Sequence, residues 1–487
     1  MSRLDFNRTA CARVPLPSWL QAVETLPLAI GLAFFVCFAL TAAIRLQSPF
    51  ALGPLDFGFL QHMRRVLDHS TVYPAPSVTF VPLQYTPLYY YVSAIAARWF
   101  GDGFLPLRLV SIVSTLWSML IIGAFVHKET GDLRAGVLAA CLFSATYRAA
   151  GAWFDIPSTD MLRLALGLSA GYVLRFCDST ASAVCAAALL VLAALAKQSA
   201  LVGGMWGAAA VATMNRRRAA VFFCAFATGV ALSTLLLIRW ESSWYPFYIF
   251  RLSTHQPTWE NIHEVFSLFS DELLGTLPIA LLLPCVLYFA APADDRPAER
   301  AVPPLFYLVG LAGGITTAMT SKALQGSGVN ATIPVYAWLA VIFGITVHSM
   351  QSCSGTRVRC RLLVTGLVLT QFLMLAYVPA SLVPTASDVM KQVQLVAITP
   401  QHTTPVRVVD SGLDRIGTAY GPAVEDLLAA GPPDVQAAFR KSIADAMCTG
   451  NATKPVILDA SIVGAVAGDG LPTCVSDEIH ARASYQR

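Results

Sequence analysis

The sequence predicts an all-α polytopic membrane protein that carries a small soluble α/β domain at its C-terminal end. Of its 487 residues, 56% are hydrophobic and 13% are charged, and the mean hydropathy of +0.60 lies well above that of soluble globular chains. Apolar runs long enough to cross about 30 Å of hydrocarbon recur between residues 26 and 382. From Val383 onward the composition turns mixed and polar, which is typical of a small soluble domain.

The apolar runs predict about eleven transmembrane helices. They lie near residues 26–44, 106–127, 135–150, 160–176, 181–196, 199–214, 219–238, 273–291, 303–319, 331–348 and 362–382. The first run follows a polar leader and has the length of a true span, so it is not read as a cleavable signal peptide. The predicted organisation is a cytoplasmic leader at 1–25, a membrane domain at 26–382 and a soluble domain at 383–487.

The stretch "YTPLYYYVSAIAARWF" at 85–100 is apolar but short for a span, and the positive-inside rule decides its placement. The basic residues fall on alternate loops, at Lys128, Arg134, Arg175, the 215–218 "NRRR" run, Arg296, Arg300 and the 357–361 loop. If the leader shares that face, only the spans at 26–44 and 106–127 connect it to Lys128. Residues 85–100 are then expected to lie along the outer surface as an interfacial helix, and Asp56, Asp155 and the C-terminal domain all face outward.

Six motifs occur in a fixed order: "LDFGFLQHMRRVL", "VYPAPSVTFVPLQYTPLYYYV", "GAWFDIPSTDMLRLAL", "LAALAKQSAL", "WYPFYIFRLSTHQP" and "SKALQGSGVNATIPV". Together they resemble the GT-C superfamily of integral-membrane glycosyltransferases, in particular bacterial members related to protein O-mannosyltransferases and lipid A aminoarabinose transferases. The resemblance covers roughly residues 25–350. It implies inverting transfer of a sugar from a polyprenyl-phosphate carrier to a lipid, glycan or protein acceptor, in a bacterial inner membrane with the site and the C-terminus facing the periplasm.

The acidic residues of these motifs are the candidate catalytic groups. Asp56 stands where the family has its catalytic acidic residue, and we assign it the role of general base; the alternative is an N-cap for the helix that begins near Phe57. Asp155 and Asp160 match the second acidic motif in outline, although Ser158 stands where related sequences often have an arginine. Asp155 is expected either to orient a sugar or to cap the following helix.

A sugar phosphate donor needs cations to receive the charge of its leaving phosphate. The candidates are Arg64, Arg65, Lys197, Arg251 and Lys322. Some similar transferases have a lysine at the position of Thr86, so here the cation must come from elsewhere. A buried Lys197 favours a bound anion or a nearby carboxylate, and the alternative is snorkelling to the interface; Arg64 and Arg65 could equally anchor a helix on headgroups.

Four further residues are expected to bind substrate because they stand in the matching motifs. They are Tyr85 of the "YTP" element, Gln198 of the "AKQ" turn, His255 of the aromatic outer loop at 239–266, and Asn330 of the glycine-rich "SKALQGSGVNA" loop. The aromatic residues of that outer loop would hold a sugar or the first prenyl units, or else form the ordinary interfacial belt.

No metal or cofactor is expected, because the sequence has no HExxH motif, no clustered His or Cys ligands and no nucleotide-binding glycine motif. Membrane lipids and a polyprenyl-phosphate sugar are the expected partners, with an unknown acceptor and no nucleic acid. In the tail, Cys448 and Cys474 flank the apolar "PVILDASIV", which predicts a buried strand. An oxidising outer space would pair them as a disulfide, and the alternative is two free cysteines, one buried and one exposed. A lipid-linked glycan ligase or polymerase is the nearest alternative function, and a transporter a more distant one.

Overall fold

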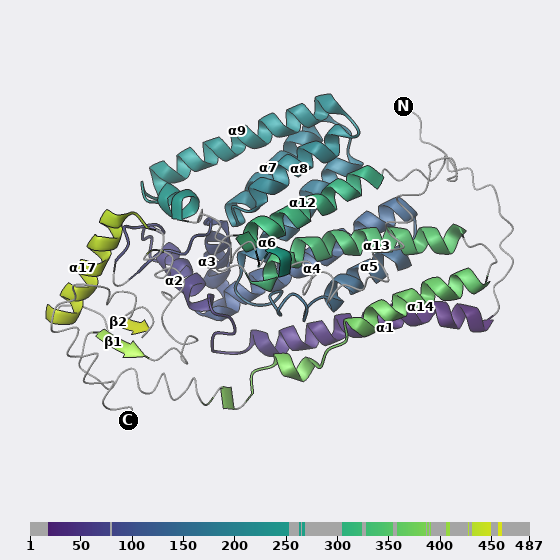
Figure 1. The fold of residues 1–487 in the computed structure, drawn as a ribbon, viewed down its shortest axis with the longest axis horizontal. Helices are drawn as coiled ribbons and strands as arrows, with labels where there is room; N and C mark the ends of the chain where they lie inside the picture. Colours follow the sequence, from purple (N-terminus) through teal and green to yellow (C-terminus); the bar gives the residue numbers. More distant parts are fainter. Residues whose placement is uncertain are drawn as a thin grey trace.

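The computed structural model describes residues 18–77, 80–252, 304–323, 328–353 and 358–385, together with 406–409, 431–449, 456–459 and a few single positions. Its main body is a bundle of helices that run along the long axis of the molecule (Figure 1). They are α1 (Ser18–Leu46), α4 (Phe104–Thr130), α5 (Leu133–Ala145), α6 (Thr159–Phe176), α7 (Thr180–Ala196), α8 (Ala200–Ala212), α9 (Arg216–Trp240), α12 (Pro304–Ala323), α13 (Ile333–Cys353) and α14 (Val358–Met374).

Each of these helices overlaps one of the apolar runs predicted to span the membrane, and the remaining run, at 273–291, lies outside the described residues. Within the described part of the chain, four helical segments are long and apolar enough to cross a bilayer on their own. They are Ser18–Leu46, Phe104–Thr130, Arg216–Trp240 and Val329–Ser352. The chain is therefore a multi-pass membrane protein, and the number of eleven spans stays a prediction.

Residues 47–103, which the sequence analysis predicts to be the first outer loop, contain two short helices, α2 (Asp56–Leu67) and α3 (Leu88–Phe100), at one end of the bundle (Figure 1). At a rise of about 1.5 Å per residue, the 13 residues of α3 extend about 20 Å, which is less than the roughly 30 Å of a hydrocarbon core. Gly101 ends this helix in a left-handed conformation (φ 84°) that glycine adopts without strain. The length of α3 agrees with the prediction that residues 85–100 do not cross.

Two hydrophobic cores position the site. The larger fills the bundle between α1, α4, α5, α13 and α14, where Gly136 of α5 lies so close to α4 that an added Cβ would sit 2.6 Å from the carbonyl oxygen of Gly123. The second, rich in tyrosine and phenylalanine, joins α2, α3 and the start of α4 to the π-helical segment η1 (Phe247–Leu252). This second core fixes the first outer loop onto the end of the bundle.

The C-terminal part contains one helix, α17 (Pro433–Thr449), and two parallel strands, β1 (Val406–Val409) and β2 (Val456–Asp459), among the described residues. Phe439 of α17 is buried in the core of the first outer loop. The strand β2 lies within the stretch that the sequence predicts as a strand. The side chain of Cys448 and all of Cys474 lie outside the described residues, so both the disulfide and the small α/β domain stay predictions.

Candidate active site

Asp160 is the centre of a buried polar cluster at the end of the bundle that carries the first outer loop. It lies in the first turn of α6, where the N-cap residue Ser158 accepts a hydrogen bond from Asp160 N at 3.1 Å. Lys197 Nζ donates to Asp160 Oδ1 at 2.7 Å, and Asn330 Nδ2 donates to Asp160 Oδ2 at 2.8 Å. The fold thus brings together three of the predicted site residues. In the sequence, 37 positions separate Asp160 from Lys197, and 133 positions separate Lys197 from Asn330.

Lys197 lies at the turn between α7 and α8 and is tied to the "YTP" element. Its Nζ lies 5.3 Å from the ring centroid of Tyr85, a geometry that favours a cation. Gln198 Nε2 donates to the carbonyl of Gln84 at 2.5 Å, and Thr86 Oγ1 donates to the carbonyl of Ala194 at 2.8 Å. Lys197 therefore provides a cation beside Thr86, the position at which some similar transferases have a lysine. Of the alternatives for Lys197, the nearby carboxylate is the one observed.

Asp56 is the first residue of α2 and is completely buried. It does not cap the helix: the N-cap is Leu55, and Asp56 Oδ2 instead accepts from the backbone of Leu52 at 2.7 Å. Asp56 Oδ1 has no hydrogen-bond partner among the described residues. Burial raises the pKa of Asp56 from 3.8 to about 7, against the lowering effects of the Leu52 N–H and of the Arg108 guanidinium. The carboxyl is therefore poised to exchange a proton near neutral pH.

Gly53 lies next to the Oδ1 atom of Asp56. A Cβ at position 53 would lie 2.9 Å from Asp56 Oδ1 and 2.9 Å from Ile156 Cδ1. Gly53 itself is partly exposed, whereas Asp56 and Ile156 are buried. A side chain at position 53 would therefore crowd the carboxyl group of Asp56.

Two arginines that sequence analysis did not single out hold the acidic residues. Arg45, at the end of α1, forms an ion pair with Asp155 (Nε to Oδ2, 2.8 Å), and both side chains are buried. Arg108, in α4, donates to the carbonyls of Arg45 (3.1 Å), Ser48 and Phe50, and its Nη2 lies 4.0 Å from Asp56 Oδ2. The N-cap of α6 is Ser158, so Asp155 does not cap this helix. Asp155 is instead paired with Arg45.

Tyr89 connects the two acidic regions. Its ring is fully buried against Phe59, and its hydroxyl donates to the carbonyl of Leu107 at 2.8 Å, one residue before Arg108. The hydroxyl oxygen of Tyr89 also accepts a hydrogen bond from the backbone N–H of Ser158 at 3.2 Å. Tyr89 thus links α4, at the residue before Arg108, to Ser158, the N-cap residue that accepts from Asp160 N.

Of the remaining predicted residues, Arg64 and Arg65 have partners outside this cluster, and the others lie on other elements or are not described. Arg64 Nε contacts both carboxylate oxygens of Asp102 at 2.9 Å on the surface, and Arg65 donates to the carbonyl of Thr71 at 2.7 Å while lying over the ring of Phe80. Arg251 is exposed on η1, and Lys322 is buried in the last turn of α12. His255 lies outside the described residues.

Comparison with known proteins identifies the fold. No protein-family model matches the chain, and no curated protein matches its sequence. The crystal structure of ArnT from Cupriavidus metallidurans bound to undecaprenyl phosphate aligns with a TM-score of 0.51 at 14% identity, over 91% of this chain and 90% of that chain. ArnT from the same organism in the apo state aligns with a TM-score of 0.54 at 14% identity, over 86% and 91%.

A third structure, of the Archaeoglobus fulgidus oligosaccharyltransferase, reaches a TM-score of 0.45 at 12% identity over 75% of this chain and 56% of that chain, too low to establish a shared fold. The two ArnT structures match nearly the whole length of the chain. The chain therefore has the fold of these two ArnT structures, which agrees with the fold that the resemblance of its six ordered motifs implied.

Proposed function

We propose that this protein transfers a sugar from a polyprenyl-phosphate carrier to an acceptor hydroxyl at the outer face of a bacterial inner membrane, with inversion at the anomeric carbon. The observation that carries the proposal is Asp56, a fully buried carboxyl whose Oδ1 has no hydrogen-bond partner among the described residues and whose pKa burial raises to about 7. General bases work best when their pKa lies near the operating pH. The ArnT fold and the undecaprenyl phosphate bound to one of its structures support the carrier.

The proposed reaction needs one base and one cation. Asp56 Oδ1 accepts the proton of the acceptor hydroxyl while the acceptor oxygen forms a bond to the anomeric carbon of the sugar. The bond from that carbon to the carrier phosphate breaks, and its electron pair leaves on the phosphate oxygen. Lys197 Nζ is the cation that we assign to the developing phosphate charge, because it is the lysine beside the "YTP" element and is mostly withdrawn from water.

The other residues of the site have supporting roles in this proposal. Asn330 and Ser158 hold Asp160 Oδ2, while Tyr85 and Gln198 fix the surroundings of Lys197. The Arg45 to Asp155 ion pair positions the loop before α6. No metal has a part in this reaction scheme.

The orientation of the protein belongs to the same proposal. Lys128 and Arg175 lie in the last turns of α4 and α6, whose first turns lie at the site, and Arg361 pairs with Glu24 near the start of α1, whose other end carries Arg45. Arg134 and the 215–218 run lie at the starts of α5 and α9. These basic residues mark the end of the bundle opposite to the site. By the positive-inside rule this end faces the cytoplasm. The site and the C-terminal part then face the periplasm.

The test is the Asp56→Asn variant, which keeps the shape of the side chain and removes the base. We expect a loss of transfer of about 10² to 10⁴-fold with the purified protein and a polyprenyl-phosphate sugar. Asp102→Asn, which removes an exposed outer-face carboxylate, is the matched control and should keep its activity. Transfer by Asp56→Asn at the wild-type rate would remove Asp56 from the mechanism.

A further inference from the structure

Asp160 has two cationic neighbours that share one of its oxygens. Lys197 Nζ lies 2.7 Å from Asp160 Oδ1, and Arg163 Nη2, one turn further along α6, lies 3.7 Å from the same atom. All three residues are nearly excluded from solvent, with side-chain exposures of 12% for Lys197, 8% for Arg163 and 3% for Asp160. Lys197 holds Asp160 Oδ1 at hydrogen-bond distance, and Arg163 does not.

The cluster carries one uncompensated positive charge. Among the described residues, one carboxylate faces two cations, while the neighbouring acids Asp56 and Asp155 already lie beside Arg108 and Arg45. Arg163 Nε also has no hydrogen-bond partner in the described part of the chain. A buried charge without a partner is costly, so the cluster is suited to receive one negative charge from a ligand.

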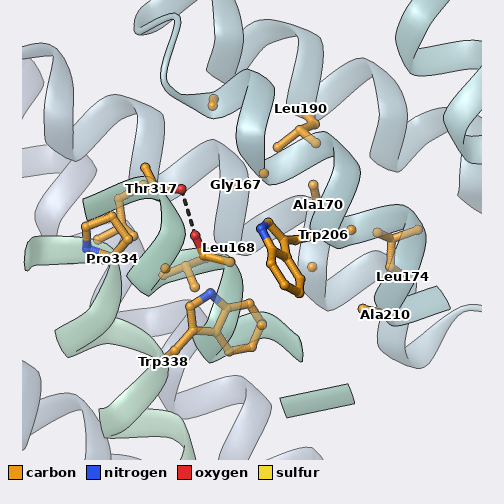
Figure 2. Close-up of a pocket in the computed structure, with 18 of the residues that line it drawn as sticks. Gly167, Leu168, Ala170, Leu174, Leu190, Trp206, Ala210, Thr317, Pro334 and Trp338 are labelled. Carbon is orange, nitrogen blue, oxygen red and sulfur yellow. Dashed lines mark hydrogen bonds between the residues drawn. The ribbon is translucent and has the colours of Figure 1, made fainter. Parts of the chain in front are cut away.

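Space adjoins Arg163. It lines a cavity of about 110 Å³ between α6, α8, α12 and α13. The other walls are apolar side chains and glycines, with the indoles of Trp206 and Trp338 close together (Figure 2). The hydroxyl of Thr317, also on the wall, donates within its own helix to the carbonyl of Gly313. One turn after Arg163, a Cβ added to Gly167 would meet nothing within 4 Å. The guanidinium therefore has room to move.

We propose that Arg163 is a positioning residue, which replaces Lys197 as the ion-pair partner of Asp160 Oδ1 when Lys197 turns to the donor phosphate. The inference rests on the proposed function and adds the event that frees Lys197. Asp160 Oδ2 stays fixed by Asn330 and Ser158, so only the partner of Oδ1 changes. The carboxylate is paired before and after the exchange, and Lys197 becomes available to the ligand.

The charge of the ligand follows from the same arrangement. A sugar phosphodiester on a carrier lipid has one negative charge, which complements the single excess positive charge of Asp160, Lys197 and Arg163. The product is a phosphate monoester, whose second ionisation, with a pKa of about 6 for phosphomonoesters, adds further negative charge at neutral pH.

The experiment compares two lipid probes that differ in charge: a polyprenyl methyl phosphate, which is a singly charged diester, and the uncharged dimethyl triester. Dissociation constants are measured on the purified full-length protein in detergent. The wild type should bind the diester more tightly. Arg163→Gln should weaken diester binding by about tenfold to a hundredfold, the loss expected for one charged hydrogen bond, and leave triester binding unchanged. Arg163→Lys should retain most of the preference.

Arg175→Gln is the matched control, because Arg175 is an ion-paired arginine of the same helix at its opposite end (Arg175 Nε to Glu129 Oε1, 2.6 Å). It should leave the affinities for both probes unchanged. An equal loss for both probes in Arg163→Gln, or no loss for either, would overturn the proposal. Since binding is measured without turnover, a protein that fails to transfer sugar but keeps the Arg163-dependent preference would contradict the proposed function alone.

Discussion

Asp56 should make the folded protein less stable as the pH rises through neutrality. Its carboxyl is fully buried, and its pKa rises from 3.8 to about 7. Since each tenfold change in an acid dissociation constant corresponds to about 1.4 kcal/mol, ionisation of Asp56 costs the folded state about 4 kcal/mol. For a group whose pKa is raised by folding, the stabilising contribution is present below the unfolded pKa and is lost as the pH passes the folded pKa.

Asp56→Asn removes this penalty and keeps an oxygen that accepts from Leu52 N. The free energy of unfolding of the variant should therefore exceed that of the wild type, and the difference should grow by about 2 to 3 kcal/mol between pH 5 and pH 8. The variant is thus expected to lose activity and to gain stability at the same time. Such opposite signs are typical of a group that is kept for catalysis at a cost in stability.

Thermal unfolding in detergent, followed at several pH values, measures this difference. The melting temperature of the wild type should fall relative to Asp56→Asn from pH 5 to pH 8, and Asp102→Asn controls for the loss of one carboxylate. Parallel pH profiles of the wild type and Asp56→Asn would refute the reasoning, because they would show that Asp56 ionises as easily in the folded state as in the unfolded one.

Three further predictions concern access, topology and the tail. Gly53→Ala should lower transfer by at least tenfold without unfolding the protein, because the added Cβ would lie 2.9 Å from Asp56 Oδ1. Steady-state kinetics resolve such a change, which corresponds to about 1.4 kcal/mol in the activation free energy. An unchanged rate would show that the acceptor approaches Asp56 by another path. A cysteine introduced at Gly103 should react with an impermeant thiol reagent in intact cells, and its protection would contradict the outward placement of the first loop. Cys448 and Cys474 should resist alkylation in unfolded, unreduced protein, because a disulfide leaves no thiol to react; the bond is expected to stabilise the tail by about 3 to 4 kcal/mol. If both are alkylated, the bond does not exist.

The sequence was sufficient for the helices but only partly for the site. Apolar runs predicted every bundle helix of the described chain, because hydrophobic length is a local property. The order of the motifs also predicted that Asp160, Lys197 and Asn330 belong to one site. Arg45 and Arg108 were missed because each stands at or within an apolar run, and their acidic partners lie 110 and 52 positions away in the chain. Only the folded structure reveals such distant pairs.

Arg163 is a further residue that the sequence did not identify as part of the site, although it stands inside the motif "GAWFDIPSTDMLRLAL". Its importance depends on the single carboxylate that it shares with Lys197. A count of charges within a buried cluster requires coordinates. A spacing of three residues between Asp160 and Arg163 on one helix face was the available signal.

The short helices beside the site have a consequence for the surrounding bilayer. With 13 residues each, α5 and α8 extend about 20 Å, and the 17 residues of α7 extend about 26 Å. Each has one end at the site, and none of them alone covers about 30 Å of hydrocarbon. The bilayer is therefore expected to be thinned around this end of the bundle. For the proposed reaction, such a depression would let a carrier phosphate reach Lys197 while its prenyl chain remains in the lipid, so that the donor would arrive by lateral diffusion without being lifted into water.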